Sequence, residues 1–156
     1  MYRHPRTGVE LNPEGWVVGY VVPSSGGGGI VQLSAQGSGA PVMVWLRSDH
    51  LAAADIPGRL RGTLQQKILQ RLDFEGYRMR PDSIQPHLIA GKQALSAVAD
   101  FTDNGQPMAE CLTLIFSENT RVLFFSRIPA SQLTDFKPRF DKLAATAVLP
   151  QAVAAR

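Results

Sequence analysis

The sequence predicts an α+β fold in which two main helices cover an antiparallel sheet, as an α/β/α sandwich. Apolar residues recur at helical spacing in only two segments, about residues 56–72 and 135–148, and most other segments have strand character. The strands of the second half follow one another through tight turns and are apolar on both faces. The length of 156 residues fits one domain, which we place at residues 2–150, with a C-terminal tail at residues 151–156.

The first third of the chain is predicted to form short strands. A small strand at residues 8–11 ends at an Asn-Pro turn signal. The segment WVVGYVV at residues 16–22 is rich in β-branched and aromatic residues, which favour strands. Two further strands are predicted at residues 30–35 and 42–47, with a loop of small residues between them.

The segment PSSGGGGI, residues 23–30, resembles a phosphate-binding loop because of its four glycines. Such a loop needs a helix after the glycines, so that the backbone N–H groups and the helix N-terminus point at the anion. Here a segment of strand character follows, and the lysine of the phosphate-loop motif is absent. We therefore interpret the segment as a flexible connection between two strands.

The first helix is predicted from apolar residues at every fourth position. They are Ile56, Leu60, Leu64, Ile68 and Leu72. This spacing places them on one face of a helix, with Asp55 as a candidate N-cap and Gly76 as a candidate stop. The basic residues of the segment mostly fall off this stripe and are expected to be solvated. They are Arg59, Arg61, Lys67 and Arg71.

After this helix the pattern returns to strands, which are expected to form an antiparallel meander. A short strand is predicted at residues 77–80 and a long one at residues 92–102. The turn at residues 103–106 contains Asn-Gly, which readily takes the positive φ angles of a type I′ hairpin. The following strands are predicted at residues 108–117 and 121–127.

The faces of the last two strands determine how many layers the fold has. In one strand Leu112, Leu114 and Phe116 alternate with Cys111, Thr113 and Ile115, and in the next Val122 and Phe124 alternate with Leu123 and Phe125. Both faces are largely apolar, whereas a sheet with one face in water alternates apolar and polar residues more cleanly. Both faces of these strands should therefore be covered.

A C-terminal helix is predicted to provide one of the two covers. Its stripe is formed by Phe136, Phe140, Leu143 and Ala147. Asp135 is a candidate cap for this helix, and Pro138 would lie in the first turn, where a missing N–H group costs little.

The residue types that support catalysis or metal binding are sparse. Cys111 is the only cysteine, and its place in an apolar strand indicates a small buried hydrophobe rather than a nucleophile. The histidines His4, His50 and His87 are far apart, so no metal site or cofactor is predicted. The net charge of +3 is spread along the chain, which argues against nucleic-acid binding. No apolar run approaches the roughly 20 residues that span a bilayer.

Six residues are candidate contacts for a ligand or a partner. They are Trp16, Tyr20, Trp45, Arg47, Asp49 and His50. The last three form a polar cluster between a strand and a helix. Residues adjacent in sequence do not point at a common centre, so helix entry or a solvated loop also explains this cluster. The three aromatic residues suit the core, the rim of a sheet or a binding pocket.

Both ends of the sequence resemble the PsbP-like superfamily. At the start, the P-x-x-G turn and P-x-x-W step of that group correspond to Pro5, Gly8, Pro13 and Trp16. Towards the end, GKQA at residues 91–94 opens a hairpin, F-x-x-x-F at residues 136–140 lies in the terminal helix, and T-x-x-L-P at residues 146–150 closes the domain. The glycine-rich connection is not part of this pattern.

The resemblance implies an α/β/α sandwich around an antiparallel sheet, in agreement with the two-sided strands. The superfamily includes photosystem II extrinsic proteins, a Ran-binding nuclear-import factor, bacterial envelope lipoproteins and domains attached to bacterial zinc peptidases. These proteins share a scaffold and not a reaction, so the resemblance assigns no catalytic residue.

We therefore predict a bacterial, non-enzymatic protein-binding or assembly module with a protein partner. Two alternatives stay open: a carrier of a small apolar ligand in a cavity between sheet and helix, and a hydrolase that uses His50. The expected location is the cell envelope or periplasm if an upstream signal was removed, and otherwise the cytoplasm. The sequence does not indicate an oligomeric state.

Overall fold

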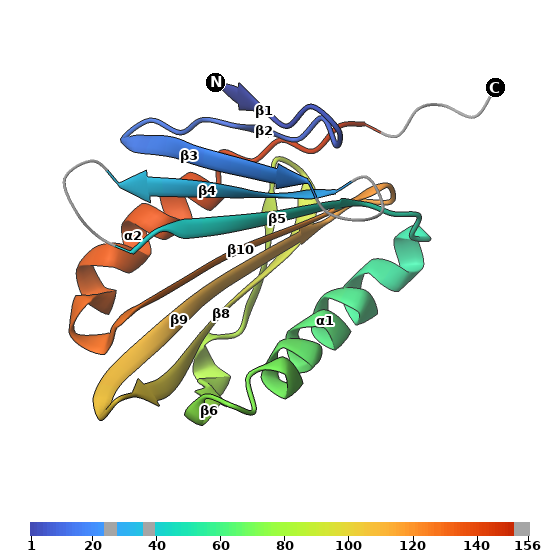
Figure 1. Cartoon of the computed structure of the whole chain (residues 1–156). Coiled ribbons are helices and arrows are strands. Elements are labelled where there is room, and N and C mark those ends of the chain that lie inside the picture. The colour runs from blue at the N-terminus through green and yellow to red at the C-terminus, as the bar shows by residue number, and fades with distance from the viewer. Residues whose placement is uncertain (24–27, 36–39, 152–156) are drawn as a thin grey trace.

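An eight-stranded antiparallel sheet forms the centre of the molecule, with one main helix on each face (Figure 1). The structure is a computed structural model that describes residues 1–23, 28–35 and 40–151. The strands, in their order across the sheet, are β3 (Trp16–Pro23), β4 (Gly29–Ala35), β5 (Val42–Ser48), β10 (Thr120–Pro129), β9 (Gln106–Phe116), β8 (Lys92–Asp103) and β6 (Glu75–Met79), while β7 (Gln85–Ile89) also pairs with β8. The predicted α+β fold is confirmed.

The two main helices lie on opposite faces of this sheet. α1 (Ile56–Gln70) contacts β6, β8 and β9, whereas α2 (Leu133–Ala144) contacts β9 and β10 and crosses behind the sheet in Figure 1. Each helix closes its own hydrophobic core. Leu114 belongs to the α1-side core and Ile115 to the α2-side core, and both are 0% exposed. The prediction that both faces are covered is therefore confirmed for the central strands.

A small ribbon at the N-terminus joins the two ends of the domain. β1 (Tyr2–Arg3) pairs with β2 (Glu10–Leu11), which is shorter than the strand predicted there. The backbone N–H groups of Glu10 and Val148 each donate to the other residue's carbonyl at 2.9 Å. The described residues also form short 3₁₀ helices at η2 (Ala53–Asp55), η3 (Pro81–Ser83) and η4 (Ala130–Gln132).

The predicted connections are partly confirmed. Asn104 and Gly105 have φ angles of 48° and 80°, as the type I′ turn between β8 and β9 requires. The strands on either side of the glycine run form as predicted, but the flexible connection itself falls on residues 24–27, outside the described part of the chain. β7 was not predicted, because Pro86 and the exposed residues around it hide the pattern of an edge strand.

The boundaries of α1 correct several predictions. Asp55 occupies the N-cap position, but its side chain makes no capping hydrogen bond. The helix ends at Gln70, so Leu72 lies beyond it and is exposed, while Gly76 lies in β6 instead of terminating the helix. Lys67 and Arg71 were expected to be solvated, and both predictions are wrong. Lys67 is buried because its side chain lies between α1 and β5. The Arg71 side chain is only 13% exposed because it pairs with the buried Glu110.

The boundaries of α2 also differ from those predicted. The η4 turn leads directly into the helix at Leu133, so Asp135 lies in the first turn and not at the cap. For the same reason Pro138 lies in the second turn, where it has no N–H group to donate to the helix. The helix ends at Ala144, and Ala147 is buried beyond its end.

Candidate functional site

The α1-side face of β3, β4 and β5 is an apolar surface without a helix over it in the described part of the chain (Figure 1). We call its apolar residues the open face: Val17, Val22, Ile30, Met43 and Trp45. The polar residues Gln32 and Ser34 of β4 share the same side of the sheet. Val17 is 51% exposed, Val22 44% and Trp45 41%. Such exposure is unusual for large apolar side chains that lie together on one sheet face.

The register shows how the open face continues into the core. Val22 pairs with Ile30 and Ile30 pairs with Trp45, so the three side chains form one row across the sheet. Trp45 pairs in turn with Leu123, which is buried in the α1-side core. The row is therefore apolar along its length, and α1 covers only the part that lies nearer β9.

A groove of about 180 Å³ lies where the open face meets α1, and we call it the α1 groove. Its walls come from α1, β5, β9 and β10. Its residues are Trp45, Arg47, Thr63, Gln66, Lys67, Gln70, Leu114, Phe116, Arg121, Val122 and Leu123. Three of these residues are cations, and none of the described lining residues is acidic.

Lys67 is the most buried cation of the α1 groove, with 8% of its surface exposed. Its Nζ lies 4.9 Å from the centre of the Trp45 ring and donates a hydrogen bond to Gln70 Oε1 at 3.1 Å. Burial lowers the pKa of the Lys67 ammonium, and the nearby guanidinium of Arg71 lowers it further. The surroundings therefore stabilise the charged form of Lys67 less well than water does.

Arg121 forms the opposite wall of the α1 groove. Its Nη2 lies 2.7 Å from Asp49 Oδ2, and its guanidinium carbon lies 5.3 Å from the centre of the Phe116 ring. Its Nε is buried and has no hydrogen-bond partner in the described part of the chain. A buried donor without an acceptor is uncommon and costly in folded proteins.

A second buried charge cluster holds the C-terminal end of α1 against the sheet. Glu110 is fully buried and accepts hydrogen bonds from Tyr77 Oη at 2.6 Å and Arg127 Nε at 2.9 Å. Arg71 Nη2 donates to the same carboxylate at 3.3 Å. Burial and the Glu110 charge raise the pKa of the Tyr77 phenol. Glu110 is thus bound by three donors, two of them cationic. Its charge favours the ammonium of Lys67, but burial and Arg71 outweigh this effect, so the pKa of Lys67 stays lowered.

The structure brings together four of the six candidate contact residues. Trp45 and Arg47 line the α1 groove, and Asp49 is joined to it through Arg121. His50 follows on the same loop, where it is exposed and donates its backbone N–H to Asp49 Oδ1 at 2.8 Å.

The other two candidates do not belong to the groove. Trp16 packs edge-to-face against Phe136 at 6.4 Å, on the α2 side of the sheet. The backbone of Tyr20 pairs with Gln32, but its side chain lies outside the described part of the structure.

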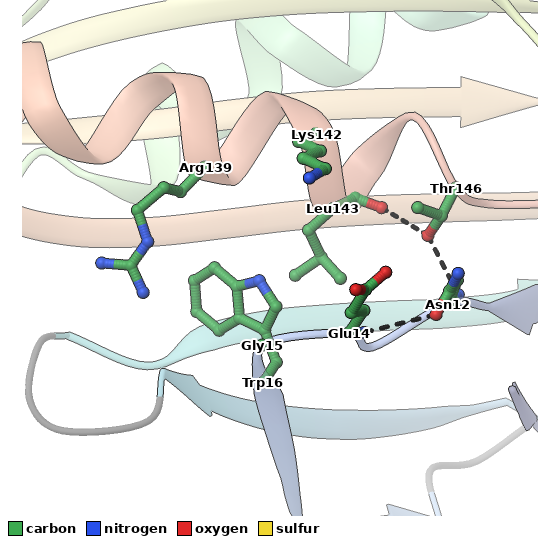
Figure 2. A pocket seen from close by; sticks show the side chains of 8 residues that line it. All are labelled: Asn12, Glu14, Gly15, Trp16, Arg139, Lys142, Leu143 and Thr146. Atoms are coloured by element: carbon green, nitrogen blue, oxygen red, sulfur yellow. Dashed lines mark hydrogen bonds between the residues drawn. The ribbon is translucent and has the colours of Figure 1, made fainter.

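Trp16 borders a different pocket, of about 210 Å³, between α2 and the segment that enters β3 (Figure 2). The guanidinium carbon of Arg139 lies 5.4 Å from the centre of the Trp16 ring. The Thr146 hydroxyl accepts the backbone N–H of Asn12 at 3.0 Å and donates to the Leu143 carbonyl at 2.7 Å. These hydrogen bonds connect the N-terminal segment to the C-terminal end of α2, so we assign them a structural role.

Cys111 shows the environment expected of a structural cysteine. It is almost fully buried, and burial raises the pKa of its thiol to about 12. No group of three His, Cys, Asp or Glu side chains is placed to hold a metal ion among the described residues. Within the same residues, no helix is long and apolar enough to cross a membrane.

Lys67 and Arg121 were not among the residues predicted to line a site. Lys67 lies three positions after Leu64 and seven after Leu60, which places it near the apolar stripe of α1. That spacing could have indicated its burial. Arg121 carries no such local signal, because Asp49 comes from a strand and loop 72 positions earlier in the chain.

No protein-family model matches the sequence, and no curated protein matches it. The solved structures that resemble it include cyanobacterial PsbP (CyanoP) from Synechocystis, with 15% identity, a TM-score of 0.61, and coverage of 96% of this chain and 91% of that one. A second similar structure is that of LpqN, a protein of Mycobacterium tuberculosis involved in cell envelope biogenesis. It has 12% identity and a TM-score of 0.55, and the match covers 94% of this chain and 87% of that one.

A third similar structure is that of a Pseudomonas aeruginosa protein of unknown function proposed to be a regulator. It has 11% identity and a TM-score of 0.51, with 94% of this chain and 85% of that one covered. At such identities the likeness concerns the arrangement of the elements and not the site. Together with the two-sided antiparallel sheet, these comparisons show that the chain has the PsbP-like fold.

Proposed function

We propose that the protein is a non-enzymatic module that binds a protein partner through the open face. The observation that carries the proposal is the uncovered row Val22–Ile30–Trp45, which continues a buried row of the core. Soluble proteins rarely expose large contiguous apolar patches, and those that they do expose often bind a partner. Tryptophan is also among the residues that contribute most to the affinity of protein interfaces.

The charges beside the open face favour a different protein over a second copy of this chain. A two-fold dimer would bring the same surface against itself. Arg47 and Lys67 of one copy would then lie near the same cations of the other, and like charges oppose association. A partner with apolar side chains and acidic residues complements this surface.

The comparisons support the non-enzymatic part of the proposal. None of the three similar structures is described as an enzyme, and all three come from bacteria, which also supports a bacterial origin. The local geometry at His50 agrees with this. The carboxylate of the adjacent Asp49 pairs with Arg121, so it is not free to orient the imidazole as a catalytic acid would.

The core under α1 favours the binding module over the carrier of an apolar ligand. Leu60 and Leu64 of α1 pack against Leu112 and Leu114 of β9, which fills the space between helix and sheet. The α1 groove lies at the side of this core and is smaller than the roughly 300–1,000 Å³ of typical small-molecule pockets. Two larger hollows, of about 430 Å³ between α1 and β7–β8 and about 480 Å³ between β7 and α2, are open to solvent at the surface and do not enclose a ligand.

The proposal can be tested by site-specific photo-crosslinking in cells of the source organism. A photoreactive residue at Val22 is expected to crosslink to one defined protein, and Trp45→Glu should abolish that crosslink. The matched control carries the same probe at Leu88, an exposed leucine of β7 away from the open face. Identical products from both positions, or products formed only with a second copy of this chain, would contradict the proposal.

A further inference from the structure

We infer that the α1 groove is a carboxylate-binding site, which receives an acidic side chain that the partner carries next to apolar residues. The inference rests on the proposed function in naming a protein as the source of the carboxylate. The site itself is inferred from four features of the groove: its excess of cations, the unpaired Nε of Arg121, its volume and the Trp45 wall.

The charges around the α1 groove are unbalanced. Three cations line it, namely Arg47, Lys67 and Arg121. Among the described residues, the carboxylate bonded to one of them is that of Asp49, which pairs with Arg121. The nearby carboxylate of Glu110 is already bound to Tyr77, Arg71 and Arg127. The described residues therefore leave Lys67 and Arg47 without an acidic partner.

This imbalance matters most at Lys67. An ammonium group that is removed from water loses hydration, and a nearby, well-aligned anion offsets more of this loss than a neutral group does. The Lys67 side chain has an amide oxygen and the face of Trp45 instead. A carboxylate in the groove would supply the missing charge, and the ammonium would bind it more strongly there than at the surface because less water screens the pair.

Arg121 supplies the second observation, which is independent of the charge count. Its Nη2 is used by Asp49, but its Nε is buried and has no partner among the described residues. Arg121 lines the groove, so an incoming carboxylate oxygen could accept a hydrogen bond from the Nε–H group. One ligand group would then satisfy the orphan donor and neutralise the buried cation.

The size and walls of the groove limit what such a ligand can be. About 180 Å³ accommodates a carboxyl group and a short stem rather than a whole cofactor. Trp45 forms one wall of the groove and also belongs to the open face. A carboxylate bound by the cations would therefore have its attached apolar groups beside Val22 and Ile30, as a partner segment would.

The test uses phenylacetate as the probe and phenylacetamide as its neutral counterpart. The full chain, labelled with ¹⁵N, has two indole N–H resonances, because it contains two tryptophans. Phenylacetate should shift the Trp45 resonance saturably and leave the Trp16 resonance in place, since Trp16 lies on the other side of the sheet. Phenylacetamide should bind at least about tenfold more weakly. Equal binding of the two probes, or no binding of either, overturns the inference.

Two variants and one control make the test specific. Lys67→Met replaces the buried ammonium by an apolar chain of similar length, and Arg47→Gln removes an exposed charge that does not support the core. Each should weaken phenylacetate binding, Lys67→Met by about tenfold. The matched control is Lys142→Met in the pocket beside Trp16, which should leave binding unchanged. Unchanged affinity in both groove variants would overturn the inference.

The outcomes separate this inference from the proposed function. Phenylacetate binding without a partner crosslink from Val22 would retain the carboxylate site and reject the proposed function. A partner crosslink from Val22, together with equal binding of phenylacetate and phenylacetamide, would retain the proposed function and reject the carboxylate site.

Discussion

The Lys67 ammonium lies 4.9 Å from the centre of the Trp45 indole ring, and this contact joins α1 to β5 at the side of the molecule where the helix stops covering the sheet. A cation over an aromatic face is attractive, but it compensates only part of the hydration that a buried ammonium loses. The buried charge of Lys67 is therefore only partly stabilised by its contact with Trp45.

The first prediction concerns the pH dependence of stability at Lys67. The pKa of Lys67 is lower in the folded protein than the ordinary 10.5. At pH values between the folded-state pKa and 10.5, the unfolded chain therefore binds more protons than the folded protein does. The free energy of unfolding of the wild-type protein should therefore gain a rising component as pH increases through this window. Lys67→Met should lack that component. Urea denaturation at several pH values, compared between the two proteins, measures the difference, and parallel curves would contradict it.

The second prediction concerns the buried carboxylate of Glu110. Glu110→Gln leaves Arg71 and Arg127 partly buried without their counter-charge, and should lower the free energy of unfolding by about 3 kcal/mol. The matched control is Asp100→Asn, which breaks the half-exposed pair with Arg80 and should cost less than about 1 kcal/mol. Urea denaturation of the variants gives both values. Equal costs would show that burial does not set the strength of the Glu110 cluster.

The third prediction compares two glycines. A methyl group on Gly29 would lie 2.7 Å from His4 Nε2 and 3.1 Å from the Val22 carbonyl oxygen, so Gly29→Ala should destabilise the protein by about 1–3 kcal/mol. Gly58 lies in α1, and a methyl group added there would meet no side chain or other segment within 4 Å, so Gly58→Ala should stabilise the protein by about 0.5–1 kcal/mol. Thermal unfolding of both variants is the measurement. A Gly29→Ala protein as stable as wild type would mean that His4 moves aside freely.

The fourth prediction concerns the single thiol. Cys111 is almost fully buried with a pKa raised to about 12, so a thiol reagent at pH 8 should react with it only when the protein unfolds. The rate of modification should therefore rise with urea in step with unfolding followed by circular dichroism. Rapid modification of the native protein would contradict the buried position.

The sequence predicted those features that depend on local pattern. The alternation around Leu114 and Ile115 was enough to predict two cores, because neighbouring residues in a strand must face opposite sides. The Asn104-Gly105 pair predicted its turn, because few other residues accept positive φ at both positions.

The features that the sequence did not predict depend on contacts between distant segments. Lys67 is buried because Trp45 reaches it from another strand, and Arg121 is held by Asp49 from the loop after that strand. The periodicity of α1 also extended to Leu72, but the chain leaves the helix at Arg71 and turns towards β6. The spacing of apolar residues predicts that a helix forms, but not the residue at which it ends.

The bridge between Glu10 and Val148 has a consequence for the order of folding. It pairs two residues that lie 138 positions apart in the sequence. Closing so long a loop costs more entropy than closing the hairpins of β8, β9 and β10. During synthesis Glu10 cannot form this bridge until Val148 has left the ribosome. The bridge is therefore among the last contacts to form, and its backbone amides should report completion of the fold in pulse-labelled hydrogen exchange.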